Sequence, residues 1–165
     1  MIFCREIEEP EGPVVLRDGS ILVVEMSPRR GCITHINEDG TEKAVIARTG
    51  RPNGLAVDAR GDIWVAESQN PSLLRVTRDG FSETFLTKCG DEDFIFPNDL
   101  AFGPDGKLYL TDSGIKTEEM VKDGVVNENF RHLDYNGRVY IIDIDTKEIE
   151  KIDDGIQFTN GIAFG

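Results

Sequence analysis

Four polar residues recur at equivalent positions along this chain, and together they could bind a metal ion. Glu11, Asn53, Asn98 and Asn160 each begin a similar stretch of sequence. One carboxylate and several amide oxygens form a set of hard oxygen ligands, which suits Ca²⁺ and, less strictly, Mg²⁺ or Mn²⁺. A single asparagine is more typical of a turn or a cap. Four such residues in one register favour a shared cation site, where Asn53 and Asn98 could also bind a substrate.

The repeated stretch is clearest between Phe96 and Gly114, where a turn joins two short apolar segments. Gly106 follows Asn98 by eight residues, and Asp112 follows Gly106 by six. The same two spacings occur in two earlier copies, Glu11–Gly19–Glu25 and Asn53–Gly61–Glu67. Counting a fourth copy that begins at Asn160, successive copies start 42, 45 and 62 residues apart. The first two intervals match the period of roughly 40–50 residues that propeller blades show.

Each of the first three copies is followed by two more β-rich segments. These cover residues 32–36 and 43–47, 73–76 and 82–86, and 139–144 and 148–152. Asp-Gly turns between such segments are typical of β-hairpins, because glycine accepts a positive φ. The inner segments, such as Ile63–Ala66, are apolar throughout, which indicates strands that are buried on both faces. Four antiparallel strands joined by tight turns make one propeller blade.

The sequence therefore predicts an all-β chain of the six-bladed β-propeller class. Residues 1–165 would form one partial propeller, with about three four-stranded blades and the first strand of a fourth. The blades would start near Glu11, Asn53, Asn98 and Asn160, with the last strand over residues 159–164. Residues 1–10 are expected to form a strand that leads into the first blade.

Residues 114–136 interrupt the third copy and account for its greater length. This stretch is polar and mixed in propensity, so we expect an extended loop or a short hairpin. Loops of this length in compact domains are often functional or mobile. A tolerated surface insertion is an equally weighted alternative.

Three acidic residues at the ends of the second apolar segments are also in register, namely Glu25, Glu67 and Asp112. We expect them to accept hydrogen bonds from the backbone of an adjacent blade. Trp64 lies in an inner segment and is expected in the core. Cys32 and Cys89 are expected to be packing residues.

The overall composition excludes several classes of function. The formal net charge of -13 would repel nucleic acids and anionic membranes. The three cysteines share no short spacing and stand apart from His35 and His132, which argues against a disulfide framework or a nitrogen- and sulfur-bound zinc. No segment resembles a signal peptide or reaches the ~20 apolar residues that span a bilayer. We therefore expect a cytoplasmic protein.

The motifs together resemble the senescence-marker-protein/gluconolactonase/luciferin-regenerating-enzyme family, over the chain from Glu11 onward. They are Glu11-Gly-Pro, Pro52-Asn-Gly-Leu-Ala-Val-Asp, Pro97-Asn-Asp-Leu-Ala-Phe-Gly-Pro-Asp-Gly, Leu110-Thr-Asp-Ser and Thr159-Asn-Gly-Ile-Ala-Phe. Paraoxonases and diisopropylfluorophosphatase are similar more distantly. The resemblance implies a six-bladed propeller with a divalent cation in its channel, in a family where many members hydrolyse lactones and some hydrolyse organophosphates.

The resemblance also implies that Glu11, Asn98 and Asn160 are metal ligands, whereas Asn53 lies in a repeat that does not usually supply one. The remaining ligand of the family is an Asp in the following repeat, which would lie beyond Gly165. That Asp is also the usual base or nucleophile, so no catalytic residue is expected in this chain. The implied cofactor is a divalent cation, Ca²⁺ first, with Mg²⁺, Mn²⁺ or Zn²⁺ as alternatives.

One departure from the family concerns the substrate. Sugar-lactone enzymes of the family tend to carry an arginine two residues before the third-repeat asparagine. Here Phe96 has that position, and Arg51 stands two residues before Asn53 instead. We therefore expect a less polar lactone or ester as the substrate.

The sequence thus predicts the N-terminal half of a metal-dependent lactonase or related esterase. The alternatives are a non-catalytic propeller used as a binding scaffold and an inactive truncated product. A half-propeller leaves two blade faces open, so the chain alone is expected to self-associate or to be unstable. Without the ligand Asp it is also expected to have negligible lactonase activity.

Overall fold

The structure is a computed structural model that describes residues 3–122 and 125–165. Three four-stranded antiparallel sheets contain most of its strands. The first sheet consists of β1 (Pro10–Val15), β2 (Ile21–Glu25), β3 (Cys32–Ile36) and β4 (Lys43–Arg48). The second consists of β5 (Pro52–Val57), β6 (Ile63–Glu67), β7 (Ser72–Val76) and β8 (Ser82–Leu86). The third consists of β11 (Pro97–Phe102), β12 (Leu108–Asp112), β15 (Gly137–Ile142) and β16 (Ile149–Ile156).

The predicted all-β character is confirmed, and within each sheet the strands follow one another in chain order. In each of the three four-stranded sheets, the first two strands are joined by a turn that contains a glycine with positive φ. These φ angles are 84° at Gly19, 89° at Gly61 and 77° at Gly106. Other residues rarely adopt this conformation, so the regular spacing of glycine along the chain sets where the strands end.

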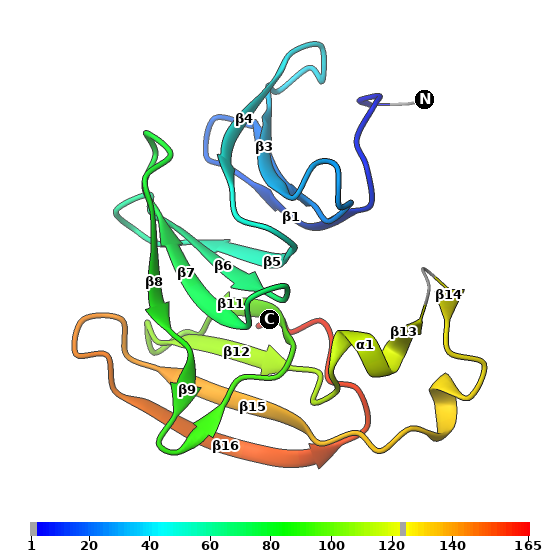
Figure 1. Cartoon of the computed structure of the whole chain (residues 1–165). Coiled ribbons are helices and arrows are strands. Elements are labelled where there is room, and N and C mark those ends of the chain that lie inside the picture. Colours follow the sequence, from blue (N-terminus) through cyan, green and yellow to red (C-terminus); the bar gives the residue numbers. More distant parts are fainter. Residues whose placement is uncertain (1–2, 123–124) are drawn as a thin grey trace.

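The three sheets follow one another around an arc, as blades of a propeller do. Figure 1 shows β1, β5 and β11 on the inside of this arc, and β4, β8 and β16 on the outside. The inner strand β5 contacts both β1 and β11. The described residues form an open arc and not a closed ring.

The second sheet is buried on both faces, which explains its lack of polar alternation. On one face, Ile63 and Val65 of β6 pack into a cluster with residues of the first sheet. On the other face, Trp64 and Ala66 pack into a cluster with residues of the third sheet. Trp64 is a core residue as predicted, and its ring meets Phe85 edge-on at 4.7 Å between centroids.

The inner strand of every sheet carries an irregularity at the same place. Pairing skips one extra residue between Glu11 and Val14 of β1, between Pro52 and Leu55 of β5, and between Pro97 and Leu100 of β11. Such bulges re-aim side chains and are frequent beside binding sites. Each one lies at or directly beside one of the repeated polar residues.

Two predicted strands are absent from the described residues. Phe3–Glu9 contain no strand, and β1 begins only at Pro10. Residues 159–165 contain none either, although a fourth inner strand was expected there. In each four-stranded sheet, the inner strand pairs with the strand that follows it in the sequence. Among the described residues, no strand pairs with residues 159–165.

The connection between β12 and β15 holds the stretch identified as an insertion. It contains α1 (Thr117–Met120), the two-stranded sheet of β13 (Val121–Lys122) and β14 (Val125–Val126), and the 3-10 helix η1 (Phe130–His132). The expected short hairpin is present, and the short helices were not predicted. The small hairpin of β9 (Lys88–Cys89) and β10 (Glu92–Asp93) was also not predicted.

Candidate metal and substrate site

The starts of the inner strands lie side by side. A Cβ atom built on Gly12 would lie 3.0 Å from Gly54 Cα, and one built on Gly54 would lie 2.7 Å from Asp99 Cα. A Cβ atom on Gly161 would lie 3.7 Å from Asp99 Oδ2, which extends the row by one member. Each of these four residues directly follows one of the repeated polar residues. The fold therefore brings four positions to the same end of the sheets: Glu11, Asn53, Asn98 and Asn160.

Two of these residues combine burial with unpaired oxygen atoms. Asn53 and Asn98 are only 9% and 5% exposed. The Asn98 Nδ2 atom donates a hydrogen bond to Ser113 Oγ at 2.8 Å, which leaves its Oδ1 atom as the available acceptor. Among the described residues, no group donates to Asn98 Oδ1 or bonds to the Asn53 side chain. Neither side chain is among the fully enclosed unpaired groups of the described residues, so these oxygens remain accessible to water or to a ligand.

The other two residues lie at the ends of the row and are exposed. Glu11 is on β1, and Asn160 follows β16. The backbone oxygen of Asn160 accepts a hydrogen bond from Thr111 Oγ1 at 2.7 Å, which holds this segment against β12. Within residues 3–122 and 125–165, no three His, Cys, Asp or Glu side chains are grouped as a metal would require. A cation at this place would therefore depend on the asparagine oxygens together with Glu11.

Asp99 is a part of the site that the sequence analysis missed. Its Oδ2 atom accepts a hydrogen bond from the backbone nitrogen of Ile162 at 3.0 Å. This contact joins the third inner strand to the segment that carries Asn160. The other three copies have glycine at this position, so the change from Asn-Gly to Asn-Asp was the available signal.

The in-register acidic residues support the same end of each sheet, but not in the way predicted. Asp112 accepts hydrogen bonds from the backbone nitrogens of Ile95, Phe96 and Gly114, at 2.7, 2.9 and 2.9 Å. Glu67 accepts one from the nitrogen of Arg51 at 2.8 Å. Ile95, Phe96 and Arg51 precede the inner strand of the same sheet and Gly114 follows its second strand, so the expected bonds to an adjacent blade are wrong. Each carboxylate therefore holds the segment that leads into the inner strand of the sheet to which the carboxylate belongs.

Glu25 plays the same part in the first sheet and is also paired with a cation. It accepts a hydrogen bond from the nitrogen of Glu8 at 2.9 Å and forms an ion pair with Arg30 at 2.7 Å. Burial alone would raise the pKa of Glu25. Hydrogen bonds from Arg30 and Thr34 outweigh it, and the pKa lies below its ordinary value of 4.5. The carboxylate is therefore held in its charged form.

Arg51 and Phe96 meet beside the row of asparagines. The guanidinium carbon of Arg51 lies 5.4 Å from the centre of the Phe96 ring, and Arg51 Nη1 donates to Ser68 Oγ at 3.0 Å. Phe96 itself is 2% exposed. Arg51 and Ser68 line a cavity of about 720 Å³, together with Phe94 and Lys116. This cavity is thus lined by a cation stacked on the buried Phe96 ring, and not by the ring itself.

An aromatic cluster ties the insertion to the segment that precedes Asn160. The rings of Phe130, Tyr135 and Phe158 meet edge-on in pairs, with centroids 5.6 to 6.1 Å apart. Tyr135 Oη also donates to the backbone oxygen of Phe130 at 2.5 Å. The insertion therefore packs against Phe158, which precedes Asn160 by two residues.

Among the described residues, no helix has the length and apolar character needed to cross a membrane. The cytoplasmic location expected from the sequence remains a prediction.

The fold and the site define an all-β, propeller-like protein with a row of polar residues where its inner strands begin. The profile of the SMP-30/Gluconolactonase/LRE-like region matches residues 9–165. The chain therefore belongs to this family, as its motifs indicated.

Individual relatives show how much of such a protein the chain represents. It is 25% identical to a gluconolactonase from Zymomonas mobilis, over 98% of this chain and 47% of the relative. A solved gluconolactonase from Xanthomonas campestris superposes with a TM-score of 0.73 at 20% identity, over 92% of this chain and 50% of the other. A nidogen/laminin complex has the same fold, with a TM-score of 0.65 at 19% identity, over 90% and 49% of the two chains. The chain spans about half the length of these proteins.

Proposed function

We propose that this chain belongs to a divalent-metal-dependent hydrolase that opens lactones or related esters. The observation that carries the proposal is the pair of buried asparagines, Asn53 and Asn98, on adjoining strands. Their side-chain oxygens have no partner among the described residues. Family membership supports the expected class of reaction, and these two accessible oxygens support the proposal of a cation.

Glu11, Asn98 and Asn160 are the proposed metal ligands, with Ca²⁺ as the first candidate. All three offer oxygen, which is the ligand chemistry that this ion prefers. When bound, the cation would polarise the substrate carbonyl and stabilise the oxyanion. Ser113 accepts the amide hydrogen of Asn98 and so directs the carbonyl oxygen away from itself. Asn53 is proposed to bind the substrate from the neighbouring strand.

The remaining parts of the proposal concern the full-length protein. We propose a six-bladed propeller of which this chain forms the first half, with the base that activates water in a repeat that follows Asn160. This residue would be the Asp that the family resemblance implies. The chain alone would then bind the cation weakly and would not turn over lactones.

Arg51 refines the class of substrate. The expectation of a less polar lactone depended on Phe96 standing where relatives carry an arginine. Phe96 is covered, and the Arg51 guanidinium lies over its ring. We therefore propose that the lactone or ester carries a polar group that accepts a hydrogen bond from Arg51.

The test is a lactone-hydrolysis assay with the full-length protein. We expect turnover of at least one aliphatic or sugar lactone, its loss after treatment with a chelator, and its return when Ca²⁺ is added. Turnover that a chelator leaves unchanged would contradict the metal-dependent mechanism.

A binding scaffold is the second candidate, because the same fold occurs in a nidogen/laminin complex, where proteins bind one another. The same assay separates the two candidates. Retained cation binding without turnover of any lactone would favour the scaffold.

We further predict that residues 1–165 alone associate with themselves. Val45 on the first sheet is 41% exposed, and Phe164, which packs on Tyr109 of the third, is 43% exposed. Val45 pairs with Thr34, on the face of the first sheet that is turned away from the second. Apolar surface that stays exposed to water lacks the roughly 25 cal/mol per Å² of stabilisation that burial would give. Light scattering should detect a dimer or larger species that Val45→Lys weakens, and a monodisperse monomer would contradict this prediction.

A further inference from the structure

A second cavity of about 460 Å³ lies between the first and second sheets. Its lining includes Leu16 and Asp18, just after β1 ends, and Asp58, just after β5 ends. The candidate metal site lies where the same two strands begin. The strands separate the two places by roughly 15 Å, at ~3.3 Å per residue. The cavity is therefore a separate site, and both of its walls belong to this chain.

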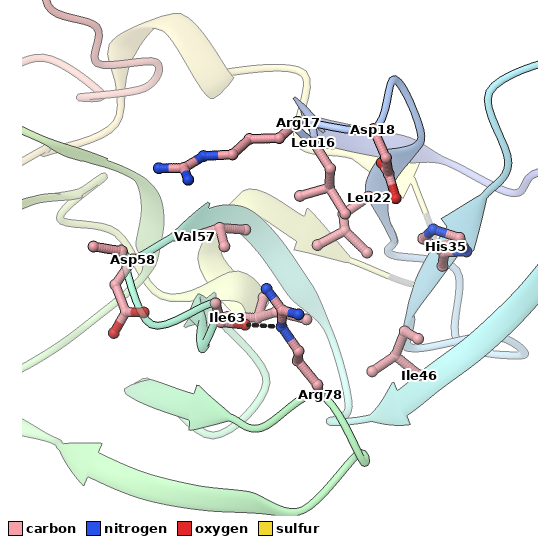
Figure 2. Close-up of a pocket in the computed structure, with 12 residues that line it drawn as sticks. Leu16, Arg17, Asp18, Leu22, His35, Ile46, Val57, Asp58, Ile63 and Arg78 are labelled. Atoms are coloured by element: carbon pink, nitrogen blue, oxygen red, sulfur yellow. Dashed lines mark hydrogen bonds between the residues drawn. The ribbon is translucent and has the colours of Figure 1, made fainter.

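One side of the cavity is apolar. Leu22 of β2 and Ile63 of β6 are 3% exposed and form its deep part. Leu16, Ile46 and Val57 are half-buried and continue the same surface. Figure 2 shows these side chains directed toward a common space between the two sheets. Such a surface can cover a short hydrocarbon chain, and the volume is within the ordinary range for small-ligand sites.

Two arginines stand at the edge of this apolar surface. Arg17 follows β1, and Arg78 lies in the turn between β7 and β8. Arg78 Nε donates to the backbone oxygen of Gly61 at 3.4 Å, and its guanidinium packs where a side chain at position 61 would be. In Figure 2 the Arg78 guanidinium points toward the middle of the cavity, whereas the Arg17 side chain extends away from Leu16 and Leu22. Neither arginine forms an ion pair with any residue that the structure describes.

The first of two nearby carboxylates is already occupied. Asp18 accepts hydrogen bonds from the backbone nitrogen of Ser20 at 3.0 Å and from its Oγ at 2.6 Å. These bonds hold the pKa of Asp18 below its ordinary value.

The second carboxylate, Asp58, is committed to its own turn. It accepts hydrogen bonds from the nitrogens of Arg60 and Asp62 and from Trp64 Nε1, at 2.8, 3.0 and 3.2 Å. In Figure 2 its oxygens face away from the apolar side chains. The two guanidinium groups are therefore the charged groups that remain available to a ligand.

We propose that this cavity binds a small amphipathic monoanion, a carboxylate on a short hydrocarbon chain. The chain would lie on Leu16, Leu22, Ile46 and Ile63. The carboxylate would accept hydrogen bonds from the guanidinium group of Arg78 and from that of Arg17, whose exposed side chain would turn toward it. Charge-assisted pairs of this kind are the stronger class of hydrogen bond. The whole chain, these two arginines included, has a formal net charge of -13 and repels anions in general. Anion binding should therefore be confined to this local pair of cations.

The test is calorimetric titration of the full 165-residue chain with octanoate, octanamide and acetate. The site lies between two sheets of one chain, so it is present whether or not the chain associates. We expect octanoate to bind about tenfold more tightly than octanamide, which has the same chain without the charge. Acetate, which has the charge without the chain, should show no binding.

The double variant Arg17→Gln/Arg78→Gln should lose about tenfold in octanoate affinity. Arg5→Gln removes an exposed arginine outside the cavity and should not. If the double variant does not fold, the octanoate and octanamide comparison on the unmodified chain decides alone. Equal affinity for those two ligands, no octanoate binding, or unchanged affinity in a folded double variant would each overturn the proposal.

Discussion

Replacing Asp112 by alanine should lower the free energy of unfolding by about 3–5 kcal/mol, because it breaks a buried hydrogen-bond network. Asp112 is fully buried and accepts hydrogen bonds from three backbone nitrogens, those of Ile95, Phe96 and Gly114. Alanine leaves all three backbone donors without their protein acceptor. The loss is a large part of the ~5–15 kcal/mol that a typical domain has in total.

Urea unfolding followed by circular dichroism measures this effect. Asp145→Ala is the matched control, because Asp145 is exposed and pairs with the half-exposed Arg60 at 3.3 Å. That variant should change the free energy of unfolding by less than about 1 kcal/mol. If both variants unfold at the same urea concentration, Asp112 does not support the third sheet as described.

Replacing Glu11 by glutamine should weaken divalent-cation binding by the full-length protein at least about tenfold, because the formal charge of the ligands strongly affects affinity. Glu11 is the only charged residue among the proposed ligands, and the substitution keeps its size and its oxygen. The stability of the sheet should not change, since Glu11 is exposed and its side chain has no bond to another described residue.

Calorimetric titration with Ca²⁺ is the measurement. Asn37→Ala provides the control, because Asn37 lies in the turn between β3 and β4, where its Nδ2 atom bonds Thr41 Oγ1 at 3.1 Å. This variant should bind Ca²⁺ as the unmodified protein does. Equal affinities for Glu11→Gln and the unmodified protein would refute the assignment of Glu11 as a ligand.

The strands could be predicted from sequence because the turn chemistry is local. A glycine with positive φ stands at a fixed distance from both strand ends, as at Gly61, and no distant contact is needed to place it. The segment at 159–165 has the same local pattern but no strand, because a strand also requires a partner. The local sequence pattern therefore predicted which segments are able to form strands. It did not predict which of them find a partner strand.

The candidate site was only half accessible to sequence reasoning. The common register of the polar residues predicted that their strand starts converge, and the row from Gly12 to Gly161 agrees with it. The contact of Arg51 with Phe96 joins residues from two different repeats, and no spacing rule links them. The sequence also showed the acidic residues in register, but not their hydrogen-bond partners. Those partners depend on the path by which each chain segment enters its sheet, which is a tertiary feature that spacing does not reveal.

The two ends of the insertion over residues 114–136 are joined by a hydrogen bond. The backbone nitrogen of Asn136 donates to the oxygen of Gly114 at 3.1 Å, and directly below this bond Asp112 of β12 pairs with Arg138 of β15. A segment closed in this way can be shortened, lengthened or exchanged without shifting the register of the strands beneath it. The same scaffold could thus acquire a different rim over its candidate site by replacing a single module, which is a natural place for substrate preference to diverge during evolution and for engineers to graft loops.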